Sequence, residues 1–214
     1  FVFVCMTTLL KNILDEQDIK CETEKNKELT TDMIKALVKT IDAKDPYTNG
    51  HSIRVAEYTR MLAEQTYTDS DELHNIYNIA LLHDIGKPEA QCRGKREGDP
   101  DMHYYGHPEK SMEIVRDIVI PELDRQGYVI SCFDVQELLY YVKYHDDHVS
   151  VKLKHVRRHT KMASFAMFQN LMLLQMADAK AHIQIPIIAE RAEICERLAG
   201  EEGRLLYQRI LDGE

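Results

Sequence analysis

Residues 81–88 read LLHDIGKP and place a histidine and an aspartate, His83 and Asp84, at the end of an apolar segment. Ile76 and Ile79 lie seven and four residues before His83, so the pair projects from a helix face that otherwise carries apolar side chains. Ionisable groups on such a face are unfavourable unless a partner compensates them. The negative end of the helix dipole also favours a cation there. We therefore expect His83 and Asp84 to bind a metal ion.

Comparable positions recur elsewhere in the chain, where single imidazole or carboxylate groups lie on apolar faces or at the start of predicted helices. These are His51, His107, His145 and Asp178. Leu171 and Leu174, for example, precede Asp178 by seven and four residues. Aspartate is rarely buried without a partner. We expect the six side chains to converge on two divalent transition-metal ions, with Fe, Mn, Zn, Co and Ni all suited to these ligands.

Simpler interpretations exist for each residue taken alone. A single histidine on an apolar helix face is often a hydrogen-bonded core residue, and Asp178 could pair with a lysine or arginine. His148 competes with His145 but lies beyond the apolar stripe that ends at His145. A purely structural helical protein would bind no stoichiometric metal. The repetition of the pattern favours the metal site.

Long segments of helical periodicity and the lack of alternating strand patterns predict an all-α fold. The expected helices cover 28–44, 52–68, 71–85, 108–124, 133–145, 160–183 and 187–211, with a long polar loop over 86–107. The chain has 214 residues, 9 glycines and 6 prolines, and no linker-like segment. We expect one helical domain over residues 28–214, preceded by a segment, residues 1–27, to which the sequence assigns no role.

The formal net charge of −9 argues against a general binder of duplex DNA, which needs lysine and arginine to neutralise phosphates. The 5 scattered cysteines suggest neither a disulfide framework nor a thiolate zinc site, so we expect a cytoplasmic protein. The opening FVFVCMTTLL is too short to cross a bilayer. The helix over 28–44 carries an apolar stripe that could pack on the core or form a homodimer. That stripe is Leu29, Met33, Leu37 and Ile41.

The spacing of these residues resembles the HD superfamily of metal-dependent phosphohydrolases. The signature of that family is a histidine, an adjacent His-Asp pair and a distant aspartate, which match His51, His83-Asp84 and Asp178. The segments DPYTNGHSIRV, LLHDIGKP and LLQMADAKAH carry the match, which runs from about Asp42 to about His182. The resemblance implies an HD-type helical bundle with the metal site between helices.

Two branches of that superfamily share features with this sequence. The first is the HD-GYP branch, which hydrolyses cyclic dinucleotides and whose start looks like the segment TIDAKDPYTNGHSIRVAEYTRMLAE. The Gly-Tyr-Pro element expected after His145 is missing, because the chain there reads YHDDHVSVKLKHVRRH. The second branch is the HD domain attached to tRNA nucleotidyltransferases, which resembles a phosphatase and cyclic phosphodiesterase. The segments that look like it are HYYGHPEKSMEIVRDI and FQNLMLLQMADAKAH. In members with two metals, further histidines complete the second site, and His107 and His145 match that order.

The resemblance implies hydrolysis of a small, nucleotide-like phosphate ester by metal-activated water, as a phosphomonoesterase or phosphodiesterase. Asp84 has two carboxylate oxygens and can bridge two metals. Lys87 and Arg54 are expected to bind phosphate oxygens. Basic residues of the long loop, Arg93, Lys95 and Arg96, and of the segment 155–159 could attract an anionic substrate. The alternatives are a non-catalytic ligand-sensing module and a cyclic dinucleotide phosphodiesterase.

Overall fold

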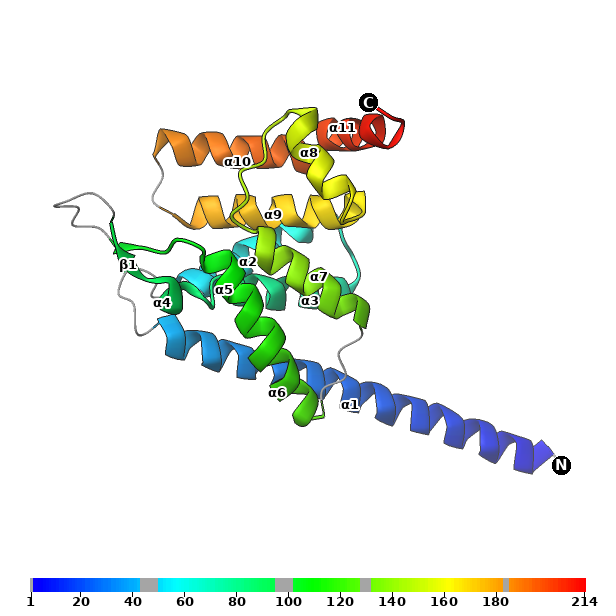
Figure 1. Cartoon of the computed structure of the whole chain (residues 1–214). Helices are drawn as coiled ribbons and strands as arrows, with labels where there is room; N and C mark the ends of the chain where they lie inside the picture. Colours follow the sequence, from blue (N-terminus) through cyan, green and yellow to red (C-terminus); the bar gives the residue numbers. More distant parts are fainter. Residues whose placement is uncertain (1, 43–49, 95–101, 128–131, 183–184) are drawn as a thin grey trace.

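The structure is a computed structural model that describes residues 2–42, 50–94, 102–127, 132–182 and 185–214. It is almost entirely helical, as the sequence predicts (Figure 1). The helices are α1 (Val2–Asp42), α2 (His51–Ala63), α3 (Ser70–Leu82), α4 (Lys87–Ala90), α5 (His107–Ile114), a π-helical turn (Val115–Val119), α6 (Ile120–Arg125), α7 (Cys132–Tyr144), α8 (Leu153–Thr160), α9 (Phe165–Ala181), α10 (Pro186–Ala199) and α11 (Glu201–Leu211). Two short strands, β1 (Cys92–Arg93) and β2 (Met102–His103), pair antiparallel.

Helix α9 forms the centre of the bundle, and α2 and α10 pack against it (Figure 1). It is apolar on nearly all sides, and Phe168, Leu171 and Met172 are fully buried. A helix without a polar face must be covered by neighbours all round. Asp178 therefore projects from the last turns of α9 into an interior enclosed by other helices.

Side-chain caps fix where two of the site helices begin. The carboxylate of Asp69 accepts hydrogen bonds from the backbone N–H groups of Asp71 and Glu72, and α3 begins at Ser70. The hydroxyl of Ser164 accepts from the N–H of Met167, so α9 begins at Phe165 rather than at 160. Capping by serine and aspartate satisfies backbone donors that have no partner within the helix.

Three local expectations were wrong. No helix was expected between 145 and 160, where α8 lies, and the long loop expected over 86–107 contains α4, β1 and β2. The single helix expected over 187–211 is two helices, because Gly200 is extended, with φ −94° and ψ −157°. The extended residue separates α10 from α11, which packs against α8.

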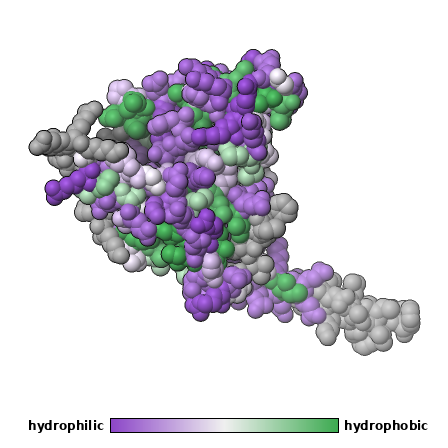
Figure 2. Space-filling model, in the orientation of Figure 1, coloured by the Kyte–Doolittle hydropathy of each residue, from purple (hydrophilic) through white to green (hydrophobic). Residues whose placement is uncertain are grey.

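Helix α1 is longer than expected, because one continuous helix runs from Val2 through the predicted boundary at residues 27 and 28. Its N-terminal part projects away from the bundle (Figure 1), and most of the described residues on that part are hydrophilic (Figure 2). The division into two segments stays a prediction. Among the described helices, none is both long enough and apolar enough to cross a membrane.

The expected apolar stripe on this helix packs on the core only in part, because Met33 and Ile41 are half-buried against it and the two leucines are not. Leu29 and Leu37 are 56% and 42% exposed, whereas Thr31, Ile34 and Val38 are buried against the bundle. The buried face is thus turned by about one residue, because α3 offers polar partners to Thr31: its hydroxyl lies 3.0 Å from His74 Nε2 and 3.0 Å from Asn78 Oδ1.

Candidate metal centre

Six side chains from five parts of the fold meet in one buried cluster, and they are the six that the sequence analysis selects. His51 begins α2, His83 and Asp84 follow α3, His107 begins α5, His145 follows α7, and Asp178 lies on α9. All six are buried. Together with the nearby His182 they form three overlapping groups in which the possible ligand atoms lie within 4.8 Å of one another.

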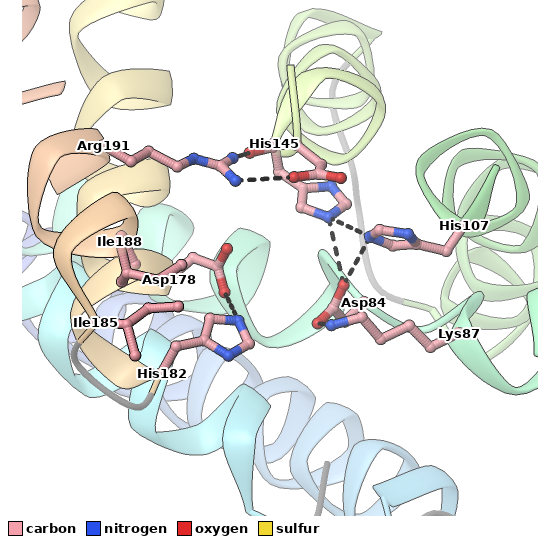
Figure 3. Close-up of a pocket in the computed structure, with 11 residues that line it drawn as sticks. Asp84, Lys87, His107, His145, Asp178, His182, Ile185, Ile188 and Arg191 are labelled. Carbon is pink, nitrogen blue, oxygen red and sulfur yellow. Dashed lines mark hydrogen bonds and ion pairs between the residues drawn. The ribbon is translucent and has the colours of Figure 1, made fainter. Parts of the chain in front are cut away.

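The two oxygens of Asp84 face two different sets of histidines. Oδ2 lies 3.5 Å from His51 Nε2 and 3.1 Å from His83 Nε2. Oδ1 lies 3.2 Å from His107 Nε2 and 3.3 Å from His145 Nε2 (Figure 3). On the first side, His51 Nε2 also lies 3.0 Å from an oxygen of Asp178. Asp84 therefore occupies the middle of the cluster, with one donor group on each side.

The orientation of three imidazole rings is fixed by the backbone. Nδ1 of His83, His107 and His145 lies 2.6, 2.9 and 2.7 Å from the carbonyl oxygen three residues earlier in each case. A carbonyl oxygen only accepts, so Nδ1 carries the proton and donates it. In a neutral ring, Nε2 then presents a lone pair to the cluster. Such an arrangement is typical of histidines that bind metals.

These lone pairs face one another without an intervening donor. Nε2 of His107 and Nε2 of His145 are 3.0 Å apart, and both are close to Oδ1 of Asp84. Among the described residues, His83 Nε2 and Asp84 Oδ1 are buried without a hydrogen-bond partner. Electron-rich atoms packed this closely repel unless a cation lies between them. The donor set therefore fits a divalent metal, with imidazole and carboxylate ligands of the kind that transition metals prefer.

The electrostatics of the cluster favour ionised carboxylates. Burial raises the pKa of Asp84, but the adjacent His83 and Lys87 outweigh it and hold that pKa well below its ordinary value. Burial likewise opposes ionisation of Asp178, but hydrogen bonds with His182 and His51 keep its pKa low. Ionised carboxylates are the form that binds metals.

The histidines on the second side differ in how readily they take up a proton. Burial lowers the pKa of His145. Burial also acts to lower the pKa of His107, but the contact with Asp84 raises it overall. A proton on His107 would compete with a metal for the same lone pair, so metal binding at this side weakens as the pH falls.

Comparison with known proteins identifies the family. The model of the family described as HD domain matches residues 48–197, which contain all six clustered side chains. The chain belongs to the HD domain family. The expected resemblance is thereby confirmed at the level of the family, and the HD-GYP branch is not specifically indicated.

A known relative of this HD domain is the 3'3'-cGAMP-specific phosphodiesterase 3 of Vibrio cholerae serotype O1. It is 50% identical over 56 residues, which are 26% of this chain and 12% of the relative. The match thus spans about one eighth of the length of that curated relative. No solved structure matches the chain.

The His-Asp pair of the HD domain is fixed by a close contact between two chain segments. The backbone N–H of Gly86 donates to the buried hydroxyl of Ser111 at 2.9 Å. A Cβ atom at Gly86 would lie 2.3 Å from the backbone nitrogen of Ser111, so only glycine fits there. This contact holds the segment carrying His83 and Asp84 against α5, which carries His107.

The residues expected to bind phosphate have different surroundings. The Lys87 ammonium group pairs with Asp84, and its side chain is 14% exposed at the edge of the cluster. Arg54 is exposed and is not among the described residues that line the adjoining cavity. Its predicted role remains a prediction. His148 is exposed and belongs to none of the three groups.

The two basic segments were expected to attract an anionic substrate, and that role stays a prediction. Lys95 and Arg96 lie outside the described residues. In the segment 155–159, His159 is fully buried and Arg158 pairs with Asp147, so this segment is partly structural.

A cavity of about 380 Å³ opens beside the cluster, and its lining includes three polar or charged residues that the sequence analysis missed (Figure 3). His182 lies 3.3 Å from Asp178, four residues earlier, and that spacing could have revealed it. Asp146 follows His145 directly and pairs with Arg191 of α10 at 3.0 Å. The sequence around Arg191 does not indicate a role at the site, because α10 reaches the site through its packing on α9.

Proposed function

We propose that this HD domain is a metal-dependent phosphohydrolase that acts on a nucleotide or a related small phosphate ester. The observation that carries the proposal is the cluster around Asp84, in which buried lone pairs face one another beside the cationic Lys87. A purely structural bundle has no use for such an arrangement, since unpaired buried polar atoms cost stability.

We assign one ion to His51, His83, Asp84 and Asp178, and a second to Asp84, His107 and His145. Asp84 would bridge them, because its two oxygens face the two sets of histidines. When bound, the metal would lower the pKa of its water toward about 7 and polarise the phosphate. Fe, Mn, Zn, Co and Ni all suit the ligands.

The side chains of the domain supply orientation and charge. Backbone carbonyls hold the imidazole rings with Nε2 directed inward, which limits rearrangement during the reaction. The Lys87 ammonium would bind a phosphate oxygen and offset the negative charge that develops there. Burial of the cluster excludes bulk water and strengthens these interactions.

A cyclic dinucleotide is the second candidate substrate, because the Vibrio cholerae relative is a 3'3'-cGAMP-specific phosphodiesterase. The absence of the Gly-Tyr-Pro element after His145 weighs against membership of the HD-GYP branch. A non-catalytic module that senses a ligand, and a homodimer formed by the domain, also stay open. An assay over mononucleotides, cyclic nucleotides and cyclic dinucleotides with several divalent metals separates turnover from binding.

The direct test replaces Asp84. We expect Asp84→Ala to lose most of its bound metal and to lower kcat/KM by about a thousand-fold, or roughly 4 kcal/mol. His74→Ala is the control, since His74 contacts Thr31 and belongs to none of the ligand groups. An Asp84→Ala protein that keeps its metal and its activity would refute the proposal.

A further inference from the structure

One wall of the cavity has a different chemical character from the metal cluster. Figure 3 shows Ile185, Ile188 and Arg191 along one side of the cavity, with Lys87 on the opposite side. Ile185 is 51% exposed, although isoleucine usually avoids water. This surface, which we call the α10 wall, consists of Ile185, Ile188 and Arg191.

Arg191 is held rigidly at the end of this wall. Its Nη1 donates to Asp146 Oδ1 at 3.0 Å, and its Nη2 donates to the backbone carbonyl of His145 at 3.4 Å. The side chain is only 20% exposed, and within the described part of the chain its Nε has no hydrogen-bond partner. A guanidinium fixed in one plane loses little entropy when it binds a further group.

The reaction at phosphorus does not account for the α10 wall. Lys87, together with the metal that the ligand groups would hold, would supply the positive charge that a phosphate needs, whereas isoleucines contribute only apolar surface. At the end of the α10 wall, the guanidinium of Arg191 offers hydrogen-bond donors, and the carboxylate of Asp146 beside it offers acceptors. A planar, apolar group with a polar edge would complement both features.

Building on the proposed function, we infer that the α10 wall is the subsite for the nucleoside part of the substrate. The base lies on Ile185 and Ile188, and its edge bonds to Arg191 and Asp146, while the scissile phosphate lies toward Lys87. Heterocyclic bases have a flat apolar face and an edge of donors and acceptors, and arginine commonly bonds to such edges. Arg191 is therefore assigned to specificity rather than to the chemical step.

Matched variants on the same helix test the assignment. Arg191→Lys keeps the charge but removes the planar fork, and Arg197→Lys is its control because Arg197 is exposed and pairs with Glu202. Ile188→Ala is paired with Ile187→Ala, since Ile187 is 67% exposed and does not line the cavity. Each is assayed with a panel of nucleotides and with bis(4-nitrophenyl) phosphate, which carries no nucleoside.

We expect Arg191→Lys to raise KM for the preferred nucleotide by about ten-fold with little change in kcat. Hydrolysis of the aryl ester, metal content and the thermal midpoint should stay near the wild-type values. Ile188→Ala should act in the same direction, and both controls should match the wild type. An equal loss on both substrates, or a loss of metal, would instead indicate that Arg191 only positions His145, and would overturn the subsite.

A binding measurement separates this inference from the proposed function. If the wild type cleaves no phosphate ester, the hydrolase proposal fails. Calorimetric titration of GMP and AMP into the wild type and Arg191→Lys then still decides the subsite, because binding needs no turnover. Weaker binding of nucleotide to Arg191→Lys than to Arg197→Lys supports it. Equal binding to these two variants, or no binding to the wild type, refutes it.

Discussion

Lys87 is the residue that we propose to act on the phosphate without binding the metal. Its ammonium group pairs with Asp84, and together with Asp178 this carboxylate raises the pKa of Lys87 even though burial opposes the charge. The lysine therefore stays charged at the mouth of the cluster. A charge in that position would bind the phosphate and also restrain Asp84.

Replacement of Lys87 should separate these two effects. We expect Lys87→Met to lower kcat/KM by about 10–100-fold, since one charge that stabilises the transition state is lost. Bound metal, measured by elemental analysis, should remain. Lys110→Met serves as the control because Lys110 is exposed and pairs only with Glu113 in the described structure. Unchanged kinetics in Lys87→Met would contradict the role assigned to the lysine.

His159 is a buried histidine outside the metal cluster. Its Nδ1 lies 2.9 Å from the hydroxyl of Tyr140 and its Nε2 lies 3.2 Å from Asp147 Oδ2. Burial, with a smaller contribution from Arg158, lowers the pKa of His159 from 6.5 to about 4. The ring thus stays neutral in the folded protein under conditions in which it is protonated in the unfolded chain.

Stability should therefore depend on pH through His159. Between pH 6.5 and about 4 the unfolded state binds the proton and the folded state does not, so stability falls as the pH falls through this range. The expected slope from this group is about 1.4 kcal/mol per pH unit. Urea unfolding across that range should give a flatter dependence for His159→Gln. Parallel curves for variant and wild type would exclude this contribution.

At the scale of the element, α1 shows that a buried helix face includes more than its leucines. The face that packs on the bundle is Thr31, Ile34 and Val38, while Leu29 and Leu37 remain largely exposed. The hydrogen bonds between Thr31 and α3 fix this rotation. Polar contacts therefore decide which side of α1 is buried.

Paired substitutions on the two faces of α1 should differ in their effect on stability. Ile34→Ala should lower the free energy of unfolding by about 2–4 kcal/mol, because it opens a cavity at a residue that is 4% exposed. Leu37→Ala should change it by less than about 0.5 kcal/mol in the monomer. Denaturant unfolding at several protein concentrations measures both. A large, concentration-dependent loss in Leu37→Ala would instead support the homodimer that the sequence left open.

At the scale of the whole molecule, the candidate metal centre brings distant parts of the chain together, and a bound ion would join them. Its six predicted ligands extend from His51 to Asp178 and lie on, or directly after, five different helices. A ligand that binds the folded state alone stabilises it according to its concentration and affinity. Metal binding should thus be visible in the global stability.

Removal of metal should therefore lower the thermal midpoint. At a free metal concentration of about 100 times Kd, the stabilisation is about 2.7 kcal/mol. For a chain of this size that corresponds to a rise of roughly 5–10 °C. Calorimetry before and after chelation, then with each divalent metal added back, tests this. Asp84→Ala should show no such rise, and a wild-type midpoint indifferent to every metal would contradict metal binding.

The cluster shows which parts of the site the sequence could reveal. The six candidate ligands are ionisable groups on or beside apolar helix faces, where an unpaired polar group is unfavourable. Residues spaced by three, four or seven share a helix face, so the sequence spacing is enough to recognise such positions. His182 follows the same rule, four residues after Asp178, and could have been included. Arg191 and Asp146 could not, since their pairing depends on how α10 packs beside the end of α7.

The sequence by itself determined the all-α class, most helices and the set of residues that meet at the centre, because helical periodicity and the burial of polar groups act over a few residues. Only the tertiary structure decided which way Asp84 directs its two oxygens, which face of α1 is buried, and which helix supplies the far wall of the cavity. These depend on contacts between segments that are remote in the chain, and short-range patterns carry no information about them.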